Sequence, residues 1–461
     1  MSKLVELVER GNELVNQFVW GPVMLAVLLG LGVYLSIRTG FFQLTKFHLA
    51  MKTTIGSLFH KQKKAKKGGI TPFQAVSTAL AGTLGTGNIV GVSTAIVSGG
   101  PGAVFWMWVS AFFGMITKYA EVVLAIKFRR KNRKGEYVGG PMYYIEEGLH
   151  CKPLAMVFAF LCICASFGIG NMTQSNSVSE ALGSTFHLNK LLVGITLAVF
   201  VGMVMLGGVK RIGKITERVV PFMGIFYTLF AVLVVFLNRD QLGEAFGLIF
   251  KYAFNVKAAA GGGAGYLIST AMRYGVSRGV FSNEAGLGSA PIAHAAADTE
   301  SPVKQGMWGI FEVFFDTIVM CTLTTLVILT SGLWDCGATG ATLTLAAFAK
   351  TLGLGASNIV SISMIFFAFA TIIGWAYYGE KCIEYLFGTQ RAVKTYRIVY
   401  VLFVVVGATT NLGLIWSISD SLNGMMAIPN IIAVTALSSV VIRETKEYCH
   451  PQFKKPTDIM H

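Results

Sequence analysis

Residues 81–92 read AGTLGTGNIVGV and lie inside an apolar segment, 72–98, that is long enough to cross a bilayer. Four glycines and three polar residues interrupt it: Gly82, Gly85, Gly87, Gly91, Thr83, Thr86 and Asn88. Each glycine lowers the stability of a helix interior by about 1 kcal/mol relative to alanine. The stretch therefore predicts a helix that breaks mid-membrane and offers its backbone groups to a polar ligand. The alternative is a tight helix contact through the GxxxG pair Gly87 and Gly91. The neighbouring Thr and Asn residues favour the break.

A second stretch of the same kind supports this interpretation. Residues 281–291 read FSNEAGLGSAP, again inside an apolar segment, 263–297. Two interrupted segments in corresponding halves of a membrane protein indicate the binding site of a transporter.

The composition places the chain in a membrane. Its 461 residues are 54% hydrophobic and 13% charged, whereas soluble proteins carry about 25% charged residues. The formal charge of +15 does not indicate a nucleic-acid partner, because the basic residues cluster in short loops where membrane orientation explains them. The seven cysteines show no spacing typical of a metal or redox centre.

The hydropathy pattern predicts eleven transmembrane helices, at 18–37, 72–98, 103–128, 153–182, 191–209, 219–237, 263–297, 307–329, 359–386, 397–412 and 419–442. Three basic loops, 38–69, 128–134 and 210–218, belong in the cytoplasm by the positive-inside rule. The N-terminus is then outside and the C-terminus inside. Amphipathic surface helices are expected at 1–16, 242–254 and 342–352, and a short cytoplasmic helix within 136–149.

Spans 2 to 6 and 7 to 11 form two sets of five, and the first member of each set is the broken one. Because five is odd, the second set enters from the opposite face, which is the plan of an inverted repeat. The expected units are an N-terminal part, a first repeat, an outer segment, a second repeat and a cytoplasmic tail: 1–70, 71–238, 239–262, 263–442 and 443–461.

A broken helix exposes free N–H groups at one end and free carbonyls at the other, which together suit a zwitterion and a small cation. Ser289 is expected to cap the second half of span 7, with Pro291 in its first turn. Thr86 or Asn88 could cap the second half of span 2 in the same way. The carboxylate of an amino acid would lie on these N–H groups.

The ammonium of that amino acid would face the carbonyls near Phe281 and Ser282. Gln174 in span 4 and Asn283 in span 7 can orient a zwitterion without adding charge. These side chains complete the predicted substrate site.

A sodium ion is predicted at the carbonyls of the span 2 break, near Thr83 to Gly85, together with the hydroxyl of Thr371. Trp375 lies four residues after Thr371, on the same helix face, and is expected to wall a small cavity. The alternative for Trp375 is an anchor at the lipid interface.

Charged residues inside the spans are expected to neutralise one another as a brace or a gate: Glu284, Arg273, Arg278, Glu312 and Asp316. Lys118 and Glu121 are expected to form a local ion pair. His294 is expected to be a satisfied polar residue and not a proton relay.

Two other classes of protein compete with a transporter. A membrane enzyme is disfavoured because the chain has no HExxH or GxSxG motif. A channel is disfavoured because its polar residues differ from span to span, whereas channels repeat the same residues in rings.

The stretches at 81–92, 99–114 (GGPGAVFWMWVSAFFG) and 278–291 (RGVFSNEAGLGSAP) resemble motifs of the alanine or glycine:cation symporter family, the sodium:alanine symporters. The resemblance implies an all-α polytopic membrane protein with eleven transmembrane helices: a LeuT-like 5+5 inverted repeat and one extra N-terminal helix. It implies substrate contacts at Thr86, Gly87, Asn88, Gln174, Phe281, Asn283 and Trp375.

The expected function is therefore secondary active symport of alanine and glycine with sodium, in a bacterial inner membrane. The alternative is a proton-coupled or other-substrate transporter of the same fold. The expected partners are the amino acid, sodium and membrane lipid, with no nucleic acid and no obligate protein partner.

Overall fold

The protein is almost entirely helical in the computed structural model, which describes residues 3–58, 65, 68–254, 263–353, 355–410 and 412–450. The N-terminal part consists of α1 Lys3–Val19, α2 Pro22–Arg38, α3 Phe42–Thr45, α4 Phe47–Thr53 and α5 Ile55–Leu58. The predicted surface helix at 1–16 is thus present as α1. It packs against α22, and the Asn12 side-chain amide donates to Ser417 Oγ at 2.7 Å.

The first predicted break is confirmed. Helix α6 (Pro72–Thr83) starts at a capping box, in which Thr71 and Gln74 each accept the other's backbone N–H at 3.1 Å. After α6 the chain makes one 3₁₀ turn, η1 (Thr86–Asn88), and then continues as α7 (Val90–Gly99). A Cβ at Gly91 would meet no atom within 4 Å, so the alternative of a tight GxxxG contact is wrong there.

The second break is confirmed as well. Helix α15 (Gly263–Asn283) ends, and the short α16 (Ala290–His294) begins after six irregular residues. Three of these residues have positive φ: Glu284 at 57°, Gly286 at 90° and Gly288 at 79°. Glycine adopts this conformation without strain, which explains the two glycines in the stretch.

The remaining helices fill the predicted spans and surface segments. Between the two breaks lie α8 Ala103–Lys127, α9 Pro141–Gly148, α10 Lys152–Phe167, α11 Thr173–Phe186, α12 Lys190–Met205, α13 Gly208–Leu237, η3 Arg239–Gln241 and α14 Leu242–Ala253. After α16 come α17 Pro302–Val313, α18 Thr322–Thr330, α19 Gly340–Leu352, α20 Gly355–Phe387, α21 Gln390–Thr409, α22 Leu412–Ala436 and α23 Ser438–Cys449. The tail therefore begins as a helix, and residues 451–461 lie outside the described part of the chain.

Two long helices contain a π segment. The segment η2 (Gly168–Met172) joins α10 to α11, and η5 (Phe314–Cys321) joins α17 to α18. Such segments are rare and frequently occur at functional sites.

The sequence analysis missed a small hairpin. Strands β1 (Arg130–Lys131) and β2 (Tyr137–Val138) pair antiparallel in the loop between α8 and α9, with Arg130 opposite Val138. The run is too short and too basic to show a strand pattern.

By length and composition, seven helices of the described residues are long and apolar enough to cross a membrane, or eight if the bent pair α22 and α23 is one span. The two broken spans do not qualify as single long helices, because each is divided at its break. The number eleven therefore stays a prediction.

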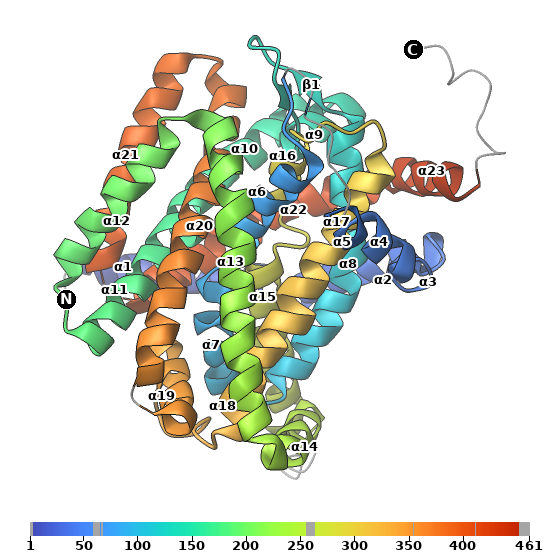
Figure 1. Ribbon diagram of the computed structural model, residues 1–461. Helices are drawn as coiled ribbons and strands as arrows, with labels where there is room; N and C mark the ends of the chain where they lie inside the picture. The colour runs from blue at the N-terminus through green and yellow to red at the C-terminus, as the bar shows by residue number, and fades with distance from the viewer. Residues whose placement is uncertain are drawn as a thin grey trace.

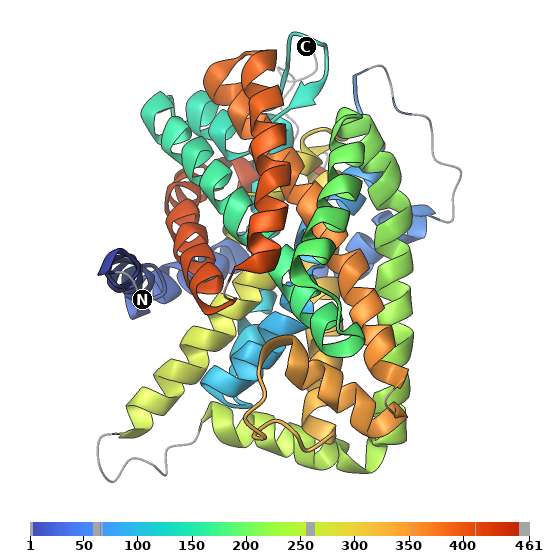
Figure 2. The ribbon, with the colours of Figure 1, turned by 90° about the vertical axis from the view of Figure 1, so that its left-hand side faces the viewer.

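The broken helices lie inside the bundle. Helix α6 packs against α13, α16 and α20, while α8 packs against α15, α16 and α17. In Figure 1, α13 runs in front of α6 and α15, the hairpin and α9 lie at the upper end, and α14 and α19 lie at the lower end. Figure 2 shows α14 lying crosswise to the long helices.

Candidate functional site

The two breaks meet in the middle of the bundle. A Cβ at Gly87 in η1 would stand 3.3 Å from Phe281 Cδ1 and 3.4 Å from Ser282 Cα, at the end of α15. All three residues are buried. The structure thus brings together segments that are nearly 200 positions apart in the sequence.

Gln174 and Asn88 hold the first break in shape. The side-chain oxygen of Gln174 accepts the backbone N–H of Thr86 at 3.1 Å and its hydroxyl at 3.0 Å. The Gln174 amide nitrogen donates to Ile169 O at 2.9 Å. Asn88 Oδ1 accepts the Gly85 N–H at 3.1 Å. The expectation that Thr86 or Asn88 caps α7 is wrong, because Ile89 precedes α7 and no side chain caps it.

The second break is held by its own side chains. Asn283 Oδ1 accepts the Ala285 N–H at 3.0 Å, and Asn283 Nδ2 donates to Thr317 Oγ1 at 3.0 Å. Pro291 stands in the first turn of α16, as predicted. Ser289 occupies the N-cap position of α16, as predicted, but its side chain does not cap the helix, because its hydroxyl donates instead to the Glu284 carboxylate at 2.5 Å.

Asp316 joins the two breaks. Its Oδ1 accepts the Asn88 amide at 2.7 Å and the Ser282 hydroxyl at 3.1 Å, and its Oδ2 accepts the Thr317 hydroxyl at 2.7 Å. Asp316 is completely buried in the π segment η5. A carboxylate here favours a cationic group beside the breaks.

The predicted sodium ligands are partly brought together. A Cβ at Gly85 would stand 2.5 Å from Thr371 Oγ1, and that hydroxyl lies 3.4 Å from Leu84 O. Thr83 lies one turn away, with its hydroxyl 3.4 Å from Ala79 O and Leu80 O of its own helix.

Trp375 lies at the same level of the bundle and is completely buried. Its Cβ would be 2.2 Å from a Cβ at Gly170, so the tryptophan packs directly on the π segment η2. Among the described residues its indole N–H makes no hydrogen bond of normal geometry, although it interacts with the Glu284 carboxylate. A buried position in protein argues against the alternative of a lipid-interface anchor.

A buried ionic chain lies beside the second break. Lys118 on α8 donates to Asn283 O, the last residue of α15, at 2.8 Å, and lies 3.3 Å from Glu312 Oε1. Glu312 also contacts His294 Nε2 at 3.1 Å, and Gln305 bonds the other ring nitrogen at 2.9 Å. His294 is thus satisfied, as expected.

The expected local pair of Lys118 and Glu121 is wrong, and the other charged residues do not neutralise one another as expected. Lys118 pairs with Glu312 and not with Glu121, whose Oε1 accepts the Asn430 amide at 2.5 Å. Arg273 donates to Asn16 Oδ1 at 3.0 Å, and Glu284 is bonded by Ser289. Spacing in the sequence did not reveal these partners, because the packing of distant helices decides them.

Arg278 binds Asp420 on α22. The guanidinium makes two parallel bonds to the carboxylate, at 2.6 and 2.7 Å. Directly beside them Phe281 stacks on Trp416 with ring centroids 4.8 Å apart. These four residues form a layer over the breaks, and a cavity of about 230 Å³ lined by Arg278, Trp416 and Asp420 adjoins it.

The sequence analysis did not identify Trp416 and Asp420 as site residues. The signal present in the sequence is an acid and a tryptophan within WSISD, residues 416–420, at the start of an apolar span. Asp316 was noted only as a brace or gate, whereas the structure places it between the predicted substrate residues Asn88 and Ser282.

Comparisons with known proteins agree with this arrangement. The model of the family described as "Sodium:alanine symporter family" matches residues 5–460. The chain is 51% identical over 442 residues to the sodium/alanine symporter AgcS of Methanococcus maripaludis, covering 94% of this chain and 96% of that relative.

Two solved transporters share the fold. The structure of MhsT in complex with L-phenylalanine matches with a TM-score of 0.56 at 14% identity, covering 83% of this chain and 99% of that one. A Na⁺-coupled sialic acid symporter in a substrate-bound outward-open state matches with a TM-score of 0.56 at 13% identity, covering 92% and 98%. Both have the LeuT fold, which confirms the predicted fold class of an all-α, LeuT-like membrane protein. The family model and AgcS identify transporters and not enzymes. The chain therefore belongs to the sodium:alanine symporter family.

Proposed function

We propose that this symporter takes up small neutral amino acids, alanine and glycine, together with sodium by alternating access. The observation that carries the proposal is the contact between the breaks, where Gly87 lies against Phe281 and Ser282. Backbone groups released from both helices meet at this contact, and they recognise a zwitterion without a charged side chain for each end.

The substrate carboxylate lies on the backbone N–H of Gly87, before α7, because the N–H groups of its neighbours Thr86 and Asn88 already bond protein acceptors. The substrate ammonium faces the carbonyls around Phe281 and Ser282. The Asp316 carboxylate, bonded to Asn88 and Ser282, makes the surroundings of the breaks favourable for positive charge.

Gln174 and Asn283 orient the substrate chiefly by fixing the breaks. The polar atoms of both side chains already bond protein groups, so each holds a loop in the binding shape. Such preorganisation lowers the entropy that binding costs.

The size of the site limits the substrate. Phe281 covers Gly87 and is itself stacked on Trp416, while Trp375 packs against the π segment η2. We expect these aromatic rings to limit the substrate to a hydrogen or methyl side chain and to exclude branched ones.

Sodium is the coupling ion, held by carbonyls near Thr83 to Gly85 and by the Thr371 hydroxyl. The proximity of Gly85 to Thr371 Oγ1 supports this placement. One net charge that moves inward gains about 2.3 kcal/mol per 100 mV. At 1.4 kcal/mol per tenfold change, this supports roughly fifty-fold accumulation of a zwitterion.

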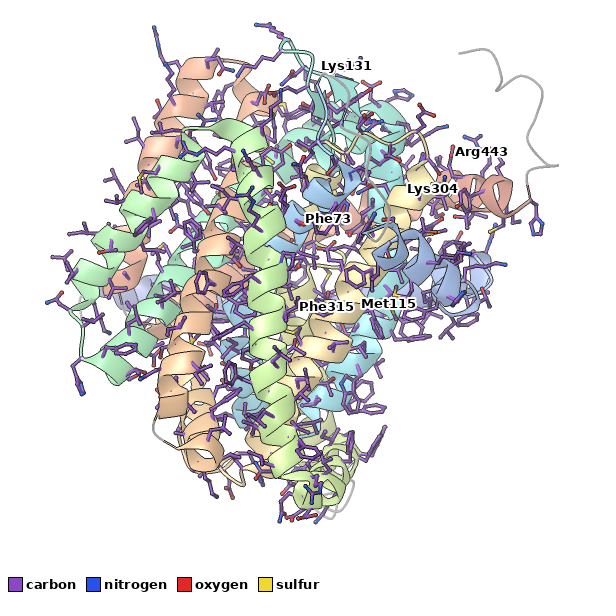
Figure 3. All side chains as sticks on the ribbon, in the orientation of Figure 1. Phe73, Met115, Lys131, Lys304, Phe315 and Arg443 are labelled. Carbon is purple, nitrogen blue, oxygen red and sulfur yellow. The ribbon has the colours of Figure 1, made fainter. Side chains whose placement is uncertain are left out.

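The membrane orientation and the repeat boundaries, 71–238 and 263–442, are part of the proposal. Basic residues of the expected cytoplasmic loops, such as Lys131 and Lys304, lie toward the upper end in Figure 3, whereas Phe73 and Phe315 lie nearer the middle. This distribution supports a cytoplasmic upper end.

The test is uptake of labelled alanine and glycine into proteoliposomes that contain the purified protein. An inward sodium gradient should drive accumulation, and an inward proton gradient without sodium should not. Excess unlabelled glycine should compete, whereas valine should compete weakly. Equal uptake with the proton gradient would show that the coupling ion is the proton. Absence of both alanine and glycine uptake would refute the proposed substrates.

A further inference from the structure

The two broken helices are joined to each other at the upper end of the molecule. Ile70, just before α6, pairs with Ala297, just after α16, in a parallel β-bridge. The Ile70 N–H donates to Ala296 O at 3.1 Å, and the Asp298 N–H donates to Ile70 O at 2.8 Å. The two helices cannot separate at this end while these main-chain bonds remain.

Arg129 secures this bridge from the loop that follows α8. Its guanidinium donates to three carbonyls of one short segment: Ala295 O at 3.3 Å, Ala297 O at 2.5 Å and Thr299 O at 2.6 Å. The segment directly follows α16, so the cation also lies at the negative end of the half-helix. The guanidinium stacks on Tyr137 at 4.0 Å, which fixes its orientation.

The hairpin β1–β2 connects this cluster to α6 and α20. The Tyr137 N–H donates to Gly68 O at 3.1 Å, next to the bridge. Glu136 lies 3.5 Å from Lys381 Nζ of α20, and Lys381 also binds Glu384 at 2.8 Å. Burial alone would raise the pKa of the Glu136 carboxyl, but Lys381 and the Asn132 amide hold its pKa below the ordinary value, so it is charged at neutral pH.

The cavities at the two ends of the molecule differ in volume. At the junction of Gly68, Ile70, Tyr137, Ala296 and Lys381 the cavity is about 10 Å³, which is the space for about one water molecule. Beyond the Arg278–Asp420 layer the cavity is about 230 Å³. The chain is thus packed tightly at the Arg129 end, whereas a larger cavity lies on the other side of the breaks, separated from them by the Arg278–Asp420 layer.

We propose that residues 128–138, hereafter the latch, hold the inner ends of both broken helices together, and that Arg129 is the positioning residue whose release permits inward opening. The inference rests on the proposed transport function, because alternating access requires this end to open once per cycle. Without Arg129 the carbonyls after α16 lose their cation, the bridge between Ile70 and Ala297 weakens, and the inward-open population increases.

The first measurement is hydrogen–deuterium exchange with mass spectrometry on the purified protein, without substrate. Arg129→Gln should exchange about tenfold faster than wild type in the peptides that carry the Ile70 and Asp298 amides, which corresponds to 1.4 kcal/mol. Peptides of α15 around Arg278, at the other end, should not exchange faster. Arg129→Lys should give an intermediate rate, because lysine keeps the charge but not the forked donors.

Arg133→Gln is the matched control. Arg133 lies in the same loop, carries the same charge and is exposed, so its removal should leave exchange at the bridge unchanged. Equal exchange in Arg129→Gln and wild type, or the same increase in Arg133→Gln, would overturn the proposal.

The second measurement is transport. A larger inward-open population lowers the apparent affinity for outside sodium in proportion to the lost outward fraction. Arg129→Gln should therefore raise the sodium concentration for half-maximal uptake several-fold while alanine–alanine exchange at saturating sodium persists. Loss of both activities together with a lower melting temperature would indicate a structural role only.

Should Arg129→Gln not fold, Glu136→Gln releases the latch from α20 and should accelerate exchange at the same amides. If neither variant accelerates it, the latch is refuted. Because the exchange experiment uses no substrate or sodium gradient, its outcome is independent of whether the wild type transports alanine.

Discussion

Gly85→Ala should impair sodium coupling through a contact and not through backbone strain. Gly85 has φ of −130°, which alanine adopts readily. Its new Cβ would stand 2.5 Å from Thr371 Oγ1 and 3.1 Å from Gln174 Oε1. Both neighbours are side chains that the proposal gives a role in binding, so neither can move without a functional effect.

The expected size of the effect follows from the packing. Overpacking of a filled interior costs about 1–3 kcal/mol. At 1.4 kcal/mol per tenfold change, this cost corresponds to about a 5–150-fold increase in the sodium concentration for half-maximal uptake. The sodium dependence should change more than the alanine affinity, because the shortest contact of the new Cβ is with Thr371, the proposed sodium ligand.

The assay is initial-rate uptake of labelled alanine at saturating alanine with varied sodium. Gly91→Ala is the matched control in the same stretch, because its Cβ meets nothing within 4 Å and should change the sodium dependence little. The double variant with Thr371→Ala removes the oxygen at 2.5 Å and should regain stability but not sodium affinity. Wild-type sodium dependence in a folded Gly85→Ala protein would refute the reasoning.

Three further outcomes are expected. Trp375→Ala should admit larger amino acids such as serine or valine, or abolish binding, and unchanged selectivity in competition assays would show that Trp375 is no cavity wall. Gln174→Leu leaves the N–H and hydroxyl of Thr86 unpaired, at about 1–3 kcal/mol, so alanine affinity measured by calorimetry should fall about 5–150-fold; unchanged affinity contradicts the assignment. Asp420→Asn leaves the Arg278 charge without its counter-ion and should lower the melting temperature. An unchanged melting temperature would show that the pair does not stabilise the protein.

The positions of both breaks were predictable from the sequence because glycine and polar residues have a local cost in an apolar helix. Helices α6 and α15 end where this cost predicts, and Pro291 stands in the first turn of α16, which starts at Ala290. The sequence did not reveal that the Ser289 side chain fails to cap α16. Its hydroxyl bonds a buried carboxylate, Glu284, and is therefore not available to the helix.

The partners of the buried charges were not predictable, because they lie far apart in the chain. Asn88 meets Asp316 across 228 positions, and Arg278 meets Asp420 across 142. Spacing rules describe neighbours on one helix, and they therefore suggested Lys118 with Glu121, whereas the packing of α8 on α17 gives Lys118 with Glu312. The latch is missed for the same reason, since its bonds join three separate loops.

The two π segments are expected to constrain the evolution of this chain. A π turn holds more residues than an α turn, so η5 and η2 behave like residues inserted into otherwise regular helices. Deletion of one residue from η5 would restore an α-helix without loss of hydrogen bonding, yet it would rotate everything on one side of the deletion by roughly 100° relative to the other. After a deletion that follows Asp316, Asp316 at the breaks and Thr324 of α18, which bonds Tyr227, could then no longer both keep their present contacts. In homologous transporters, the length of these two segments should therefore vary less than that of the surrounding loops, even where the residues themselves differ.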